Sequence, residues 1–414
     1  MGKTFKTEAG RRLRTEGLLG AGGEGCTYAA TDLKSGEKGV IKLFHQNKFD
    51  PKLRLERIRF LVSLKLQQAC SALNAPMDPI IDGKEVGHFS PWADGENLED
   101  FASPRTFMDD AFLAFAIAIA FDTLHKSGIA HGDIQAGNIK VHKTPDGPIA
   151  AKVIDLDNFQ VKGVAPPFMI GHELYLSPEA RMARRKKLAL LPCQNTDLYS
   201  LGVIFHEILL GVHPSSGADH DQATLDAVVE SGWSLHDPLN PRHAPGRGNG
   251  GSPWEVLDSR LSALLRDALS ANPERRPRAE AWRIALSEAV WKVFPCPRCG
   301  GCIIIDPSKT VCPFTGCRKP YPGFTLRTKS GIAIPIDRGM VLLGRDECGG
   351  SMKVSSRHAT LRKIGPETWL EPHGSNGTRR WTGREWLTLQ RPVVLNKGDR
   401  IKFADVEAEV LELN

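Results

Sequence analysis

The residues best suited to chemistry in this chain are two aspartates and an asparagine beside a pair of apolar runs. Asp133 and Asn138 lie in the segment His131-Gly132-Asp133-Ile134-Gln135-Ala136-Gly137-Asn138, and Asp155 follows the second run. Phosphoryl transfer from ATP needs a carboxylate to position the accepting hydroxyl and oxygen ligands to hold Mg²⁺. Asp133 suits the first task, and Asn138 and Asp155 suit the second.

These side chains need elements that hold them together. Residues 139–141 and 149–154 predict two strands joined by a turn at Pro145-Asp146-Gly147. Such a hairpin brings Asn138 and Asp155 to one end. The apolar run Ala111–Phe121 predicts a buried helix that leads the chain to His131, because it is too short to span a bilayer.

A glycine-rich turn lies near the N-terminus, between two apolar strands. Its glycines, Gly20, Gly22 and Gly25, would let backbone amides approach phosphate oxygens without Cβ clashes. The pattern alone is equally typical of a flexible hairpin.

A lysine follows inside a strand that is otherwise apolar. Lys42 lies in the run 39–44, where a buried ammonium requires an anion nearby. The next helix is expected to open at Asp50-Pro51, with the aspartate as its cap. Glu56 in that helix is the expected partner of Lys42; the alternative is a solvated glutamate on the helix face.

From about Arg14 to Val290 the sequence resembles a eukaryotic-like Ser/Thr protein kinase domain of the bacterial type. Further downstream, Ser177-Pro178-Glu179 stands for the Ala-Pro-Glu motif, the segment 197–202 for the helix that anchors the catalytic loop, and Arg276 for the partner of Glu179. The resemblance implies that Gly20, Gly22 and Gly25 cover the ATP phosphates, Lys42 pairs with Glu56, Ala93 lies in the adenine-binding hinge, Asp133 is catalytic, and Asn138 and Asp155 bind Mg²⁺.

Four positions depart from that kinase pattern. Gly132 replaces an arginine, Gln135 a lysine, and Asp157 a glycine, while His172 stands in place of a threonine that braces the catalytic aspartate. No Ser or Thr occurs in residues 158–176, so activation by Ser/Thr phosphorylation of this loop is not expected.

These departures keep two alternatives open. One is a pseudokinase scaffold in which the C-terminal module does the binding. If the chain is an active kinase, its activity is expected to be low. The other is a small-molecule kinase, because His-Gly-Asp with Asn five positions on also resembles the phosphotransferases that modify aminoglycosides and choline.

Cysteines dominate the segment after residue 293. Cys296, Cys299, Cys312 and Cys317 form two thiolate turns that suit a closed tetrahedral site for structural Zn²⁺. Cys302 is a spare that is expected to start a strand of a hairpin turning at Asp306-Pro307. A reduced, metal-free cluster and an iron–sulfur site are the alternatives.

The last ninety or so residues alternate between short apolar strands and turns, which predicts a β-sandwich. Three loop clusters, 344–345, 355–358 and 375–378, resemble in order and spacing the forkhead-associated (FHA) domain, a reader of phosphothreonine peptides. A plain β-sandwich with polar loops is the alternative. Arg345 would give a bidentate contact to phosphate and Ser355 a hydroxyl donor. The resemblance implies that Ser356 and Ser375 flank the phosphate, Asn376 holds the peptide backbone, and His358 braces the loops.

Composition is ordinary for a soluble globular protein: 414 residues, a net charge of +6 and nine cysteines. The N-terminus has no apolar core of a signal peptide, so we expect a cytoplasmic protein. No pattern of basic and aromatic residues indicates nucleic acid, and no segment indicates a membrane.

The expected architecture is therefore α+β: a bilobal kinase fold in 1–293 (N-lobe about 14–92, C-lobe about 93–293), a zinc ribbon in 294–323 and an FHA sandwich in 324–414. The expected partners are a protein substrate and a phosphothreonine-containing protein. By resemblance to bacterial signalling systems, a PP2C-type phosphatase and a von Willebrand A protein are expected companions.

Overall fold

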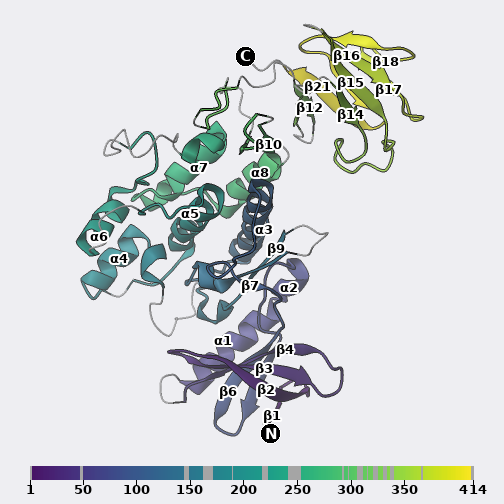
Figure 1. Cartoon of the computed structure of the whole chain (residues 1–414). Helices are drawn as coiled ribbons and strands as arrows, with labels where there is room; N and C mark the ends of the chain where they lie inside the picture. The colour runs from purple at the N-terminus through teal and green to yellow at the C-terminus, as the bar shows by residue number, and fades with distance from the viewer. Residues whose placement is uncertain are drawn as a thin grey trace. The chain divides into compact units, whose positions relative to one another are not determined.

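The structure is a computed structural model of the whole chain (Figure 1). It describes residues 2–46, 50–143, 149–161, 171–188, 190–216, 222–240, 253–290, 293–296, 298–304, 311–314, 316–319, 325–329, 333–335, 340–364 and 367–411. Two predicted turns, Pro145-Asp146-Gly147 and Asp306-Pro307, lie outside these residues.

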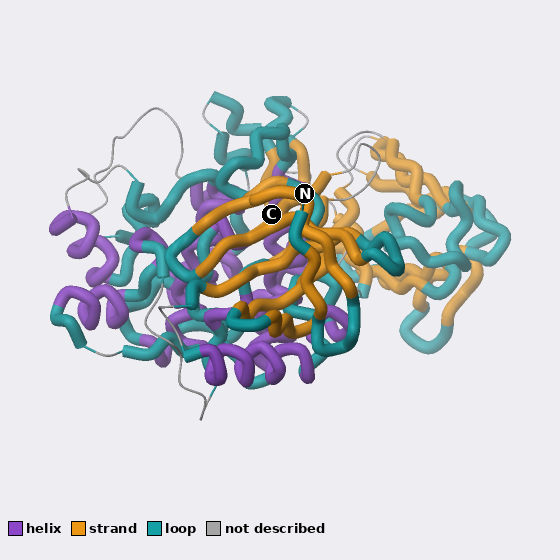
Figure 2. The backbone as a smooth tube through the Cα atoms, turned by 90° about the horizontal axis from the view of Figure 1, so that it is seen from below, coloured by secondary structure: helices purple, strands orange, loops and turns teal. Residues whose placement is uncertain are grey.

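An antiparallel sheet of six strands forms the N-terminal lobe, and its strands run side by side in Figure 2. Its order is β1-β2-β3-β4-β6-β5, with β1 (Thr4–Lys6), β2 (Arg12–Ala21), β3 (Gly25–Asp32), β4 (Lys38–Phe44), β5 (Asp78–Asp82) and β6 (Glu85–Pro91). Leu13, Ile41, Ile80 and Phe89 are fully buried in its core.

Helix α1 (Pro51–Ser63) packs against this sheet and is followed by the short α2 (Leu66–Ala69). The expected start of α1 is confirmed, because the Asp50 side chain accepts a hydrogen bond from the Lys52 amide at 2.9 Å and Pro51 is the first helical residue.

Helices form most of the second lobe. They are α3 (Phe107–Lys126), α4 (Pro178–Arg185), α5 (Gln194–Leu210), α6 (Gln222–Ser231), α7 (Ser259–Ala268) and α8 (Ala279–Ala289). The expected buried helix is α3, whose apolar residues from Ala111 to Phe121 include many that are fully buried and which begins at a capping box of Thr106 and Asp109.

A small sheet in this lobe positions the candidate site. It has the order β7-β8-β9, with β7 (Glu96–Asn97), β8 (Ile139–Lys143) and β9 (Ile149–Val153). The expected hairpin is confirmed, since β8 and β9 pair antiparallel with Ile139 opposite Val153. Short 3₁₀ turns flank these strands at Ala136–Asn138 and Leu156–Asn158.

The cysteine segment holds a small strand pair. Strand β10 (Val293–Pro295) pairs with β11 (Cys302–Ile304), and Pro295 lies opposite Cys302. Cys302 therefore starts a strand as expected. That strand pairs with β10, which precedes it in the sequence, whereas the expected hairpin had it pair with the residues that follow.

Two antiparallel sheets follow. One has the order β13-β12-β21-β20-β17-β18 and the other β14-β15-β16-β19. Their strands are β12 (Thr325–Thr328), β13 (Ala333–Pro335), β14 (Met340–Leu343), β15 (Ala359–Ile364), β16 (Glu367–Pro372), β17 (Thr378–Trp381), β18 (Trp386–Thr388), β19 (Val393–Leu395), β20 (Arg400–Phe403) and β21 (Val406–Leu411). Leu361 and Leu370 of one sheet share a core with Phe403 and Val410 of the other, as a β-sandwich requires.

The chain divides into two compact units, residues Met1–Pro241 with Leu264–Arg283 and residues Arg242–Ala263 with Ile284–Asn414. The boundaries expected at residues 293 and 323 stay predictions. Among the helices that the structure describes, none is both long and apolar enough to cross a membrane.

Candidate active site

The Asp133 carboxylate is held by hydrogen bonds to both of its oxygens. Gln135 donates from Nε2 to Oδ1 at 3.0 Å, and Asn138 donates from Nδ2 to Oδ2 at 3.2 Å and to the Asp133 backbone carbonyl at 2.8 Å. The carboxylate is thereby fixed next to Asn138, the residue that directly precedes strand β8. Gln135, which departs from the kinase pattern, is therefore one of the two side chains that hold this carboxylate.

Asp197, at the start of α5, anchors the loop that carries Asp133. It is buried, and its carboxylate accepts hydrogen bonds from the amides of His131 at 2.6 Å and Gly132 at 3.0 Å. Gly132 has a φ of +82°, and a Cβ there would lie 3.1 Å from the Asn158 carbonyl oxygen. The left-handed backbone and the close approach explain why a glycine suits this position.

A cavity of about 670 Å³ lies beside this loop, within the size range of small-molecule sites. Of the residues expected to bind nucleotide or metal, Gly20, Lys42, Ala93, Asn138 and Asp155 line it. Asn138 and Asp155 enter from the same end of the hairpin, because the Ile154 amide donates to the Asn138 carbonyl at 2.9 Å.

The other two glycines of the N-terminal turn close the turn itself. The Gly22 amide donates to the Gly25 carbonyl at 2.9 Å. A Cβ at Gly25 would lie 2.0 Å from the Leu43 carbonyl oxygen, so close approach of β3 to β4 requires a glycine there.

Three carboxylates surround Lys42. Its Nζ lies 2.5 Å from Asp155 Oδ1, 2.6 Å from Asp157 Oδ2 and 3.6 Å from Glu24 Oε2. Burial acts to lower the pKa of Lys42, but the negative charges of Asp157, Asp155 and Glu24 outweigh it and hold the pKa above its ordinary value. Lys42 is therefore a fixed positive charge inside the cavity.

The prediction that Glu56 pairs with Lys42 is wrong. Glu56 is exposed, whereas the buried face of α1 consists of Arg54, Arg57, Ile58 and Leu61. Two residues correspond to about 200° of helical turn, so the face that buries Arg54 and Ile58 points Glu56 to the opposite side.

Two residues beside Asp157, His88 and Ser90, were not predicted from the sequence. The buried carboxylate of Asp157 lies 3.2 Å from His88 Nε2, and His88 Nδ1 is 3.1 Å from the Ser90 hydroxyl. Burial acts to raise the pKa of Asp157, but Lys42 and His88 lower it well below its ordinary value. His88 and Ser90 line the cavity from β6, and their signal in the sequence was two polar residues in a buried strand.

The segment that follows is described only up to residue 161 and from residue 171 onward. His172 is exposed and its Nδ1 accepts from the Leu174 amide at 3.4 Å, so its hydrogen bond serves the local turn. The expected ion pair between Arg276 and Glu179 is formed and bidentate, with both N···O distances at 2.7 Å.

Residues 13–284, more than half of the chain, match the protein kinase domain family. The chain belongs to the protein kinase family. It is 28% identical over 278 residues to serine/threonine-protein kinase PknB of Mycobacterium tuberculosis, which covers 63% of this chain and 40% of that relative.

Two further bacterial relatives have similar coverage. Serine/threonine-protein kinase A of Synechocystis is 25% identical over 281 residues, which is 63% of this chain and 50% of the relative. Serine/threonine-protein kinase pkn3 of Myxococcus xanthus is 23% identical over 293 residues, which is 66% of this chain and 49% of the relative. The kinase chain thus spans about half or less of the length of these relatives.

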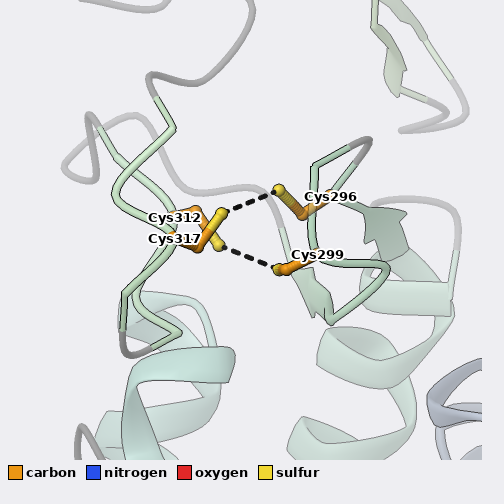
Figure 3. A group of neighbouring side chains, drawn as sticks. All are labelled: Cys296, Cys299, Cys312 and Cys317. Carbon is orange, nitrogen blue, oxygen red and sulfur yellow. Dashed lines mark hydrogen bonds between the residues drawn. The ribbon is translucent and has the colours of Figure 1, made fainter.

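Outside the matched span, the four expected cysteine ligands converge (Figure 3). The sulfurs of Cys296, Cys299, Cys312 and Cys317 all lie within 4.8 Å of one another. Cys296 is 3.6 Å from Cys317 and Cys299 is 3.7 Å from Cys312, Sγ to Sγ. Cys302 is not part of this group; its Sγ lies 3.8 Å from the Gly300 carbonyl.

The three loop clusters of the C-terminal sandwich also come together. Arg345 Nε donates to the Val354 carbonyl at 3.4 Å, and Asn376 Nδ2 donates to the Lys353 carbonyl at 2.6 Å. Both loops therefore contact the middle one. Ser355 and Ser356 follow these carbonyls, and Ser375 precedes Asn376; Ser356, Ser375 and Asn376 are exposed.

His358 supports these loops from inside. It is fully buried, its Nδ1 accepts from the Ser355 amide at 3.2 Å, and its Nε2 lies 3.3 Å from the Gly377 carbonyl. Burial lowers the pKa of His358. A neutral ring with the proton on Nε2 satisfies both contacts.

Proposed function

We propose that this chain is an ATP- and Mg²⁺-dependent protein kinase that phosphorylates Ser or Thr in protein substrates. One observation carries the proposal: Lys42, Asn138 and Asp155 line a single cavity beside an Asp133 carboxylate whose two oxygens are both fixed by hydrogen bonds. A cation for phosphates, two oxygen ligands and a positioned base are the parts that phosphoryl transfer uses.

Each residue then has a distinct task. Asp133 accepts a hydrogen bond from the substrate hydroxyl and orients it, while Gln135 and Asn138 keep the carboxylate from rotating. Lys42 binds phosphate oxygens, and Asn138 with Asp155 would hold Mg²⁺. When bound, Mg²⁺ supplies charge neutralisation on the phosphates. Ala93 places the adenine, and Gly20, with the turn through Gly22 and Gly25, covers the phosphates.

The test is incubation of the purified chain with γ-labelled ATP, with and without Mg²⁺, followed by phosphoamino acid analysis. We expect Mg²⁺-dependent label on serine or threonine of the chain itself or of added proteins. Label only on small molecules, with ATP consumed, would instead assign a small-molecule kinase. ATP binding with no transfer to either would assign a pseudokinase.

We also propose that Cys296, Cys299, Cys312 and Cys317 bind one structural Zn²⁺. A tetrahedron of sulfurs about 2.3 Å from zinc has edges of about 3.8 Å, close to the 3.6 and 3.7 Å separations. Four thiolates leave no open position, which is the pattern of a structural site. The residues present therefore fit the ion, within a ribbon proposed for residues 294–323.

We propose that the C-terminal sandwich, residues 324–414, is an FHA-type reader of phosphothreonine. The convergence of Arg345, Ser355 and Asn376 on three linked loops supports this, since a guanidinium and a hydroxyl at one edge form a phosphate site. Ser356 and Ser375 would flank the phosphate, and Asn376 would hold the peptide backbone.

Joined in one chain, a reader and a kinase would recruit a phosphothreonine-bearing partner and raise its effective concentration near Asp133. A cytoplasmic location and companions of the PP2C phosphatase and von Willebrand A types remain proposals that rest on resemblance to bacterial signalling systems.

A further inference from the structure

We infer that Asp157, and not a residue of helix α1, is the partner that positions Lys42 for ATP. The inference rests on the proposed kinase function and assigns a role to an acid where the kinase pattern has glycine. The observation behind it is the 2.6 Å contact from Lys42 Nζ to Asp157 Oδ2, in a chain whose Glu56 faces solvent.

Helix α1 has no acid to offer Lys42. Glu56 is its one acidic residue, and the buried side carries Arg54, Arg57, Ile58 and Leu61. Turning Glu56 inward would bring Ile58 and Leu61, which are almost fully buried, into water, which is unfavourable for both side chains. The amphipathic pattern of α1 therefore fixes Glu56 outside.

The burial and the contacts of Asp157 suit it to position Lys42. Its side chain is 3% exposed, against 31% for Asp155, and a buried carboxylate is stable only when it is paired. Lys42 lies on one side and His88 on the other, with Ser90 behind His88. A buried carboxylate held by two partners is restrained, and through the ion pair it restrains Lys42, which also donates a hydrogen bond to the more exposed Asp155.

Helix α1 acts on this pair through the backbone. Arg57 is buried, donates to the carbonyl of Asp157 at 3.3 Å and to the carbonyl of Phe159, and stacks over the Phe159 ring at 4.3 Å. Arg57 thereby fixes the segment that carries Asp157. A movement of α1 would move Asp157, and with it Lys42, although no side chain of α1 needs to touch the lysine.

The competing role for Asp157 is that of a Mg²⁺ ligand beside Asp155. The two roles differ in what they predict. A positioning residue acts on phosphate binding through Lys42, so its loss should not be compensated by more metal. A lost metal ligand raises the Mg²⁺ concentration needed for activity, and excess Mg²⁺ restores the rate.

The experiment compares Asp157→Asn with Glu56→Gln in the full-length chain. We expect Asp157→Asn to lower kcat at least tenfold at saturating Mg²⁺ and to weaken ATP·Mg binding at least fivefold by calorimetry. Adenosine, which has no phosphates, should bind within twofold of the wild-type affinity. Glu56→Gln should match the wild type in all three measurements.

Three results would overturn the inference: Asp157→Asn behaving like the wild type, Glu56→Gln producing the losses, or excess Mg²⁺ restoring the Asp157→Asn rate. If the wild type transfers no phosphate, the proposed function fails, but the comparison of ATP with adenosine still decides the role of Asp157.

A second variant guards against misfolding of Asp157→Asn. His88→Asn removes one partner of Asp157 and leaves both charges of the Lys42–Asp157 pair. It should weaken ATP·Mg binding twofold to tenfold and leave adenosine affinity unchanged. Equal loss of ATP and adenosine binding would show a structural effect and count against the inference.

Discussion

Asp133 and Asp155 are both carboxylates near the cavity, yet their contacts separate their tasks. Asp133 is locked by Gln135 and Asn138, while Asp155 lies against Lys42 in the cavity wall. A locked carboxylate suits orientation of a hydroxyl, and a partly exposed one in the cavity suits metal binding.

Asp133→Asn and Asp155→Asn should therefore differ in their effect on ATP binding, although both should lose phosphoryl transfer. Each should lower phosphoryl transfer by about 10²-fold or more, because each removes a group that acts in the transition state. Only Asp155→Asn should also weaken Mg²⁺-dependent ATP binding. Steady-state kinetics with a direct nucleotide titration at several Mg²⁺ concentrations measures both. Wild-type turnover in Asp155→Asn would refute its assignment as a metal ligand.

A second residue-scale prediction concerns Glu207 in α5, whose carboxylate accepts a hydrogen bond from Tyr175 at 3.0 Å. Burial, aided by the charge of Glu99, raises the pKa of Glu207 from 4.5 to about 7. The folded state therefore takes up a proton near pH 7 that the unfolded chain takes up only near pH 4.5. The free energy of unfolding should rise as pH falls through this window, by up to about 3 kcal/mol.

Glu207→Gln removes this ionisation while keeping an acceptor for Tyr175. By scanning calorimetry, the variant should be more stable than the wild type at pH 8, and the difference should shrink toward pH 5. Glu96→Gln, at an exposed position, is the control and should show no such trend. A difference that does not change with pH would contradict the assignment.

At the scale of elements, local patterns predicted much of the framework. The Asp50-Pro51 helix start, the buried helix through Ala111–Phe121 and the 139–154 hairpin are confirmed. Each was predicted from a local signal: a helix-capping residue, the length of an apolar run, or short apolar strands on either side of a turn.

The expectation for Glu56 failed because it considered the position of the glutamate along the helix and its charge, but not which face of the helix is buried. Positions 54, 57, 58 and 61 are the buried positions of α1, and two of them are arginines whose contacts lie far along the chain. Sequence alone does not show that Arg57 meets the carbonyl of Asp157, or that His88 meets its carboxylate, because those contacts span 100 and 69 residues.

The cysteine segment supports a prediction of its own. Protein purified without chelator should contain one equivalent of zinc by elemental analysis, because a segment with so little apolar core needs the metal to fold. Cys299→Ser with Cys312→Ser should abolish it. Cys302→Ser is the matched control and should retain the metal, since Cys302 lies outside the four-sulfur group. Absence of zinc from the wild type, or its retention in the double variant, would refute the site.

The whole molecule combines a kinase domain with a β-sandwich whose three loops meet at one edge. The sequence predicted the kinase domain and the short strands of the C-terminal part, while the roles of the three loops stay predictions. It did not predict the division of the chain, in which residues 242–263 group with the C-terminal part. Such grouping depends on contacts between distant segments, which no local pattern encodes.

If the sandwich reads phosphothreonine, Arg345→Ala in the full-length chain should weaken binding of a phosphothreonine peptide at least tenfold, equivalent to about 1.4 kcal/mol. Asn376→Ala should weaken it through the peptide backbone. Arg391→Ala, an exposed arginine outside the three loops, is the control. Fluorescence titration against a peptide library tests this, and equal binding of unphosphorylated peptides would leave the sandwich a structural module.

The ion pair between Arg276 and Glu179 has a consequence for how the protein is made. The two residues are 97 positions apart, so Glu179 leaves the ribosome well before its partner exists. Arg276 also donates to the carbonyls of Asn195 and Ser270, and it thereby joins three segments in one step. Until that arginine emerges from the ribosome, the hydrogen bonds that link Glu179, Asn195 and Ser270 through it cannot form.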